Sequence, residues 1–135
     1  MSAGYSGTPL VRKLGFKPGM RAHYVAAPDD FAALLGDLPD VRVLARPAAP
    51  LDLVVLFVTS RAQLQRRLPG LHAKLRQDGI VWVAWPKRAS RVPTDMTEDV
   101  VRDVALARGL VDVKVCAIDE TWSGLKLVIR RELRT

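Results

Sequence analysis

Cysteine is almost absent from this chain, which carries only Cys116 among its 135 residues. A lone thiol cannot form a disulfide within the chain, and it cannot supply a metal site built from several cysteines. So low a cysteine content is typical of proteins from a reducing compartment. We therefore expect a cytoplasmic protein without a metal site.

Long apolar stretches are absent too. The two longest, Leu53–Val58 and Ile80–Trp85, are too short to span a bilayer. Residues 1–10 are polar and glycine-rich, and they lack the apolar core of a secretory signal. We expect no membrane association, a flexible N-terminal arm over residues 1–10, and a single domain over residues 11–135, which suits the length of the chain.

The familiar catalytic signatures are also missing. The sequence contains no HExxH, Walker A or GxSxG motif and no glycine-rich dinucleotide loop. His23 and His72 fall in different predicted elements, so the pattern indicates no pair of metal ligands. Cys116 lies within a predicted strand, where a thiol packs as a small apolar group. We expect no catalytic residue, and the sequence favours a protein that is not an enzyme.

Basic side chains, in contrast, are abundant. The chain has 21 lysines and arginines against 14 acids, a net charge of +7, and Asp78 is the only acid between residues 61 and 91. Such a block can attract an anionic small molecule or an acidic protein face, or it can simply be a solvated helix surface. No aromatic side chains alternate with these arginines, so nucleic-acid binding through a basic helix at 61–76 is the weaker alternative.

Strand and helix signals alternate along the chain. Strands are expected at residues 22–27, 41–45, 51–58, 80–85, 111–118 and 125–131. Helices are expected after Asp29 or Asp30, after Thr59 or Ser60, where leucines recur with helical spacing up to Gly79, and after Asp95, which forms a capping box with Glu98. This alternation predicts a three-layer α/β, Rossmann-like fold, with a mostly parallel sheet and a C-terminal antiparallel hairpin.

Ligand sites in such sheets lie beyond the carboxyl ends of the strands. The long polar loop at residues 86–97 follows a predicted buried strand and precedes a helix N-terminus, which favours anions. Its donors could hold an anionic small molecule, although Asp95 could instead act only as a helix cap. The candidate ligand-binding residues are Lys87, Arg88, Ser90, Arg91, Thr94, Asp95, Thr97, Glu120 and Trp122.

Two sets of segments resemble known families. The stretches LGFKPGM (14–20) and LRQDGI (75–80), together with the closing hairpin, resemble class I S-adenosylmethionine-dependent methyltransferases, with one helix–strand unit missing between Ala45 and Leu51. Residues 85–104 and 109–128 more closely resemble a family of small bacterial proteins known only as a domain of unknown function. These resemblances imply a methyltransferase-like fold and a bacterial, cytoplasmic setting, without a known activity.

The sequence departs from the methyltransferase pattern where the cofactor would bind. Ala26–Asp30, after the first strand, contains no glycine, and Pro28 removes a backbone donor. Arg46 stands near the place where a carboxylate would accept the ribose hydroxyls. We therefore expect a non-catalytic binding or interaction module without an intact S-adenosylmethionine site and with no cofactor. The alternatives are a divergent methyltransferase-like enzyme or small-anion binder that uses residues 86–97.

Overall fold

A computed structural model describes residues 7–135 of the chain. Its strands are β1 (Arg21–Val25), β2 (Arg42–Leu44), β3 (Leu51–Phe57), β4 (Leu75–Pro86), β5 (Leu110–Ala117) and β6 (Trp122–Ile129). Its helices are α1 (Leu10–Leu14), α2 (Phe31–Leu35), α3 (Arg61–Lys74) and α4 (Glu98–Ala107), with short 3-10 turns at Arg88–Ser90 and Arg131–Leu133. All six predicted strands are present.

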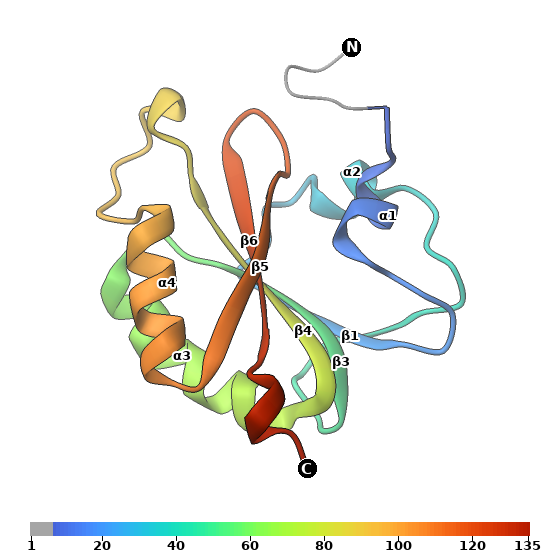
Figure 1. Ribbon diagram of the computed structural model, residues 1–135. Coiled ribbons are helices and arrows are strands. Elements are labelled where there is room, and N and C mark those ends of the chain that lie inside the picture. The colour runs from blue at the N-terminus through green and yellow to red at the C-terminus, as the bar shows by residue number, and fades with distance from the viewer. Residues whose placement is uncertain (1–6) are drawn as a thin grey trace.

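The strands form one sheet in the order β2-β1-β3-β4-β6-β5. Strands β1 to β4 pair in parallel, whereas β6 runs antiparallel to both β4 and β5. The mostly parallel sheet with a terminal antiparallel hairpin is thus confirmed. Figure 1 shows the hairpin crossing in front of the other strands.

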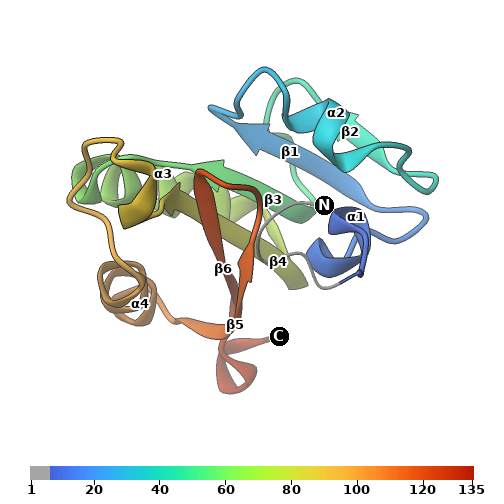
Figure 2. The ribbon, with the colours of Figure 1, turned by 90° about the horizontal axis from the view of Figure 1, so that it is seen from above.

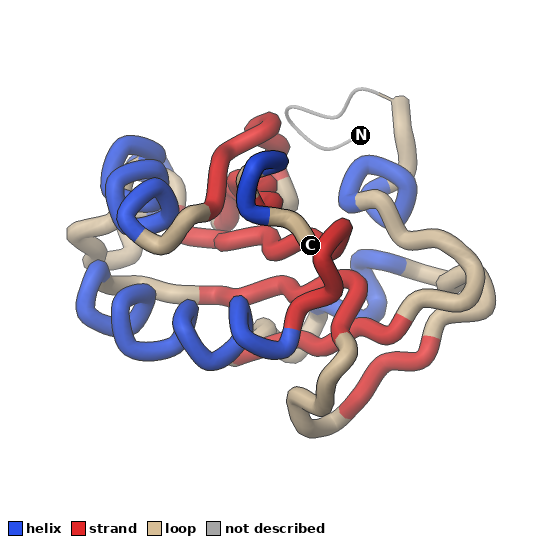
Figure 3. The backbone as a smooth tube through the Cα atoms, turned by 60° about the horizontal axis from the view of Figure 1, so that its bottom comes forward, coloured by secondary structure: helices blue, strands red, loops and turns tan. Residues whose placement is uncertain are grey.

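Helices cover both faces of the sheet. Figure 2 shows α3 and α4 on one side and α1 and α2 on the other, and in Figure 3 the strands run between these helices. Each side has its own apolar core, one containing Leu64 and Leu68 of α3 and the other containing Leu14 and Phe31. Strand β3 contributes to both cores, and this explains its almost uninterrupted apolar sequence.

The connection from β2 to β3 contains no helix. Residues 45–50 cross β1 directly, and the Arg21 side chain holds them by donating to the carbonyls of Pro50 at 2.8 Å and Ala48 at 3.2 Å. The helix–strand unit expected to be missing between Ala45 and Leu51 is indeed missing here.

Several boundaries differ from the prediction: β6, for example, begins at Trp122 rather than at residue 125, and two of the differences concern helices. Leu10, expected in the flexible arm, is the first residue of α1, and residues 1–6 of that arm lie outside the described part of the chain. The long helix ends at Lys74 rather than at Gly79, because Leu75 already pairs with Leu51 in the sheet. Both differences come from tertiary contacts that a local pattern does not contain.

The N-terminus of α3 is capped by two side chains. Ser60 accepts the Gln63 N–H at 3.1 Å, as predicted, and Asp95 Oδ1 accepts the Arg61 N–H at 2.8 Å. The predicted capping box at Asp95 is therefore wrong, since the residue that caps α4 is Thr97. Asp95 instead bonds to a helix that begins 34 residues earlier in the chain.

Replacing Asp95 tests this cap. We expect Asp95→Ala to lower the free energy of unfolding by about 1 kcal/mol, because a helix N–H and the positive end of the α3 dipole lose their acceptor. Asp95→Asn keeps an acceptor and should lose less. Urea denaturation measures both variants, and equal stability of Asp95→Ala and the wild type would contradict the assignment.

Replacement by alanine should have opposite effects on stability at two glycines. Gly70 lies inside α3 with no atom within 4 Å of an added Cβ, so Gly70→Ala should stabilise the protein by about 1 kcal/mol. Gly109 has φ +83°, and an added Cβ would lie 2.7 Å from Leu133 Cδ1. We expect Gly109→Ala to lower the melting temperature and Gly70→Ala to raise it. Shifts of the same sign would contradict this reading.

Candidate functional site

A cleft opens at the carboxyl end of β4, where the sequence predicts a ligand site. It has a volume of about 450 Å³ and lies between the loop after β4 and the beginning of α4. Its lining residues are Trp85, Pro86, Lys87, Arg88, Thr94, Asp95, Met96, Thr97, Glu98 and Ser123. The predicted candidates Ser90, Arg91, Glu120 and Trp122 do not line it.

Hydroxyl groups of this loop bind to the protein itself. Thr94 Oγ1 donates to the Thr59 carbonyl at 2.5 Å and accepts the Met96 N–H at 3.0 Å. Ser90 Oγ donates to the Lys87 carbonyl at 2.7 Å. With Thr97 and Asp95 capping helices, four of the predicted polar residues shape the loop through their own hydrogen bonds.

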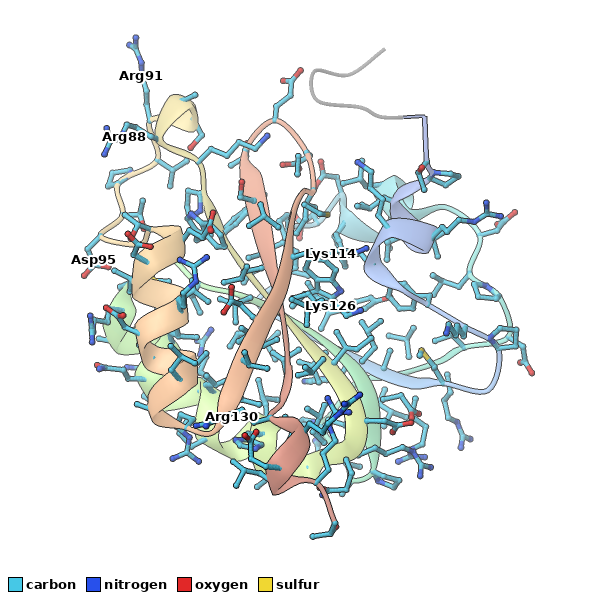
Figure 4. The ribbon with its side chains drawn as sticks, in the orientation of Figure 1. Arg88, Arg91, Asp95, Lys114, Lys126 and Arg130 are labelled. Carbon is cyan, nitrogen blue, oxygen red and sulfur yellow. The ribbon has the colours of Figure 1, made fainter. Side chains whose placement is uncertain are left out.

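The charged groups of the cleft differ in their pairing. The Asp95 and Glu98 carboxylates are bound, to the Arg61 N–H and to Arg102 respectively. Within residues 7–135, Lys87 and Arg88 form no ion pair. Figure 4 shows Arg88 and Arg91 extending outward, with Asp95 near the start of α4. The cleft therefore has two cations available for a ligand.

The β5–β6 hairpin reaches the loop through its backbone. The Lys87 N–H donates to the Thr121 carbonyl at 2.7 Å. Asp119 Oδ1 accepts the N–H groups of Thr121 and Trp122 at 2.8 and 2.7 Å, which shapes the hairpin turn. Glu120 is exposed at this turn and pairs with none of the loop cations in the described structure.

A file of aromatic rings runs along the α2 side of the same sheet edge, and the sequence analysis named only its last member, Trp122, as a site residue. Successive ring centroids lie 6.3, 5.0, 5.0 and 5.1 Å apart, each pair edge to face, in the order Phe16, Tyr24, Phe31, Phe57 and Trp122. Burial raises the pKa of Tyr24 to about 12, so this phenol stays neutral at physiological pH. Aromatic residues at or near the carboxyl ends of β1 and β3 were the available signal.

The loop after β1 has a strained backbone. Ala26 adopts φ +56°, a left-handed conformation that favours glycine. The Pro28 carbonyl accepts the Phe31 N–H at 3.0 Å, and the Asp30 side chain makes no capping bond. Helix α2 then extends for only five residues, which leaves it without a substantial dipole.

The remaining titratable groups do not converge on a site. Burial lowers the pKa of His72, with Arg108 adding to the effect, and burial raises the pKa of Cys116. His23 Nδ1 lies 2.8 Å from the Leu44 carbonyl. Residues 7–135 contain no group of three potential metal ligands. No helix among them is long and apolar enough to cross a membrane.

The basic helix of the sequence analysis corresponds to α3. Its leucines Leu64, Leu68 and Leu71 face the core, while Arg61 and Arg66 are exposed. This arrangement agrees with a solvated basic surface. Nucleic-acid binding through this helix stays a prediction.

Comparison with known proteins gives matches of structure alone. No family model and no curated protein matches the chain. A putative type 11 methyltransferase from Sulfolobus solfataricus matches with a TM-score of 0.66 at 14% identity, over 96% of this chain and 94% of that one. An S-adenosylmethionine-dependent methyltransferase from Aquifex aeolicus matches with a TM-score of 0.57 at 12% identity, over 93% and 91%.

A third similar structure is the fibrillarin of Aeropyrum pernix, solved with natively bound S-adenosyl-L-methionine. Its TM-score is 0.60 at 17% identity, over 93% of this chain and 70% of that one. Identities this low show the fold and leave the resemblance to a domain of unknown function as a prediction. The chain has the Rossmann-like fold of class I S-adenosylmethionine-dependent methyltransferases.

Proposed function

We propose that this protein is a non-catalytic binding module with a methyltransferase-like fold that does not hold S-adenosylmethionine. The observation that carries the proposal is the contact between Phe31 and Phe57, whose ring centroids lie 5.0 Å apart. Phe31 begins α2 and Phe57 ends β3, so the two rings meet at the sheet edge where ligands of such folds bind. Apolar rings offer a polar cofactor no hydrogen-bonding partner there.

The β1 loop supports the same proposal. A cofactor held at this edge needs close backbone approach and free N–H donors, but Ala26 and Ala27 carry side chains and Pro28 has no N–H. After β2, Arg46 can donate to ribose hydroxyls but cannot accept from them. These residues do not fit the cofactor that the fold otherwise accommodates, as in the fibrillarin solved with S-adenosyl-L-methionine.

A second candidate function is the binding of a small anion in the cleft beside α4. It is favoured by Lys87 and Arg88, which line the cleft without an ion pair in the described structure. The ligand class would be a phosphate- or carboxylate-bearing small molecule. This function is compatible with the first, because the cleft lies at β4 and the aromatic contact lies between α2 and β3.

Calorimetric titration tests the cofactor proposal. We expect no binding heat with S-adenosylmethionine or S-adenosylhomocysteine at ligand concentrations of about 1 mM. At that concentration, even a binding free energy of about −4 kcal/mol would give a measurable heat. The Aeropyrum pernix fibrillarin, freed of its natively bound S-adenosyl-L-methionine, serves as the positive control. A dissociation constant in the micromolar range would overturn the proposal.

A thermal-shift experiment tests the anion candidate. We expect pyrophosphate to raise the melting temperature of the wild type, because a ligand that binds only the folded state stabilises it by mass action. Arg88→Ala should abolish the shift. Arg91→Ala, which removes the same charge outside the cleft, should retain it. If both variants respond alike, the cleft is not the anion site.

A further inference from the structure

The side of the β5–β6 hairpin that faces α1 carries two lysines in opposed positions. Lys114 pairs with Lys126 in the antiparallel register, and Figure 4 shows both side chains extending toward α1. Like charges directly opposite each other destabilise a sheet. Neither lysine side chain has an ion pair or hydrogen bond within residues 7–135. The pair thus has an electrostatic cost that no partner in the described structure offsets.

A β-bulge brings these lysines together. The register shifts between Asp112 and Lys114. Asp112 lies opposite Leu127 on the α4 side, where its carboxylate accepts from Arg102 at 3.1 Å. Side chains two residues apart in a regular strand share a face, so without the bulge Lys114 would lie on that side as well. The bulge aims Lys114 at the face that already holds Lys126.

A third lysine joins them through α1. Trp82 lies opposite Lys126 in the sheet, and its indole N–H donates to the Leu14 carbonyl at 2.8 Å. This bond fixes the end of α1 against β4, and Lys17 follows three residues later. The pKa of Lys126 is lowered first by burial and then by the positive charges of Lys114 and Lys17, which agrees with this placement.

Within residues 7–135, the strands of this face carry no carboxylate beside the lysines. The residues that alternate onto it around Lys114 and Lys126 are Ile80, Trp82, Ala84, Cys116, Gly124 and Val128. Burial raises the pKa of Cys116 on this face, and the positive charges of Lys13, Lys114 and Lys87 partly oppose that rise. The surface is thus cationic and built from separate elements of the fold.

We propose that Lys17, Lys114 and Lys126 bind adjacent phosphate groups of a polyanion, supplied by a single nucleic-acid strand or by a free polyphosphate. Lysine ammonium groups bind phosphate as point charges, and a row of them suits consecutive phosphates. Bound phosphates would replace the repulsion within the lysine pair by attraction. The site is distinct from the cleft beside α4, which these lysines do not line, and it goes beyond the proposed function without depending on it.

Fluorescence anisotropy with a labelled single-stranded oligonucleotide tests the site in three double variants that each remove two positive charges. Lys114→Gln/Lys126→Gln removes the opposed pair, Arg66→Gln/Arg67→Gln alters α3, and Arg88→Gln/Arg91→Gln alters the loop after β4. We expect the lysine variant to weaken binding about tenfold at low salt and to lower the slope of log affinity against log salt by about 1.4, for two lost phosphate contacts. The arginine variants should keep the wild-type slope.

Further measurements distinguish a nucleic-acid strand from a free polyphosphate as the ligand, and they exclude unfolding of the variants. Lys114→Arg/Lys126→Arg should keep the binding, and Lys114→Gln/Lys126→Gln should melt no lower than the wild type, because it removes repulsion. Competition by tripolyphosphate would assign the site to compact polyphosphates, and its failure to compete would assign the site to a strand. Binding by neither probe, or an equal loss in all three glutamine variants, would overturn the proposal.

Discussion

The buried hydrogen bond from Trp82 to the Leu14 carbonyl is the contact on which the α1 face of the molecule depends. Trp82 is fully buried in β4, and an indole N–H in such a place requires an acceptor. Helix α1 supplies it, although five residues are too few for a helix to be stable alone. Together with the burial of Leu14 and Phe16 in the core, this bond fixes the segment that carries Phe16, where the aromatic file begins, and Lys17.

Most of the sheet could be predicted from the sequence, because the signals that indicate strands are local. The buried runs at β3 and β4 and the paired runs at β5 and β6 predict strands and a closing hairpin, and the six strands of the structure agree with them. The elements that escaped prediction depend on distant partners. Helix α1 is only five residues long and is fixed by Trp82, and α3 ends early because Leu75 joins β4.

The location of the candidate site could be predicted from the sequence, but the hydrogen-bond partners of its residues could not. The length and polarity of the loop at residues 86–97 locate the cleft at β4. Local spacing could not show that Asp95 binds the start of α3, or that Thr94 bonds to Thr59. The Lys114–Lys126 pair was equally hidden, because it depends on a bulge whose position only the paired strands define. For Asp95 and Thr94, contacts with residues 34 and 35 positions earlier in the chain engage the polar groups in structural hydrogen bonds.

Edge-to-face packing from Phe16 to Trp122 stabilises the carboxyl edge of the sheet, and the proposed function requires no cofactor there. The most direct measurement is a backbone amide NMR titration of the labelled protein with S-adenosylhomocysteine, followed at Ala26–Phe31 and at Phe57. The account predicts that these resonances do not move as the ligand is added. Saturable shifts at both segments would contradict it and would show that the edge of the sheet still holds the cofactor.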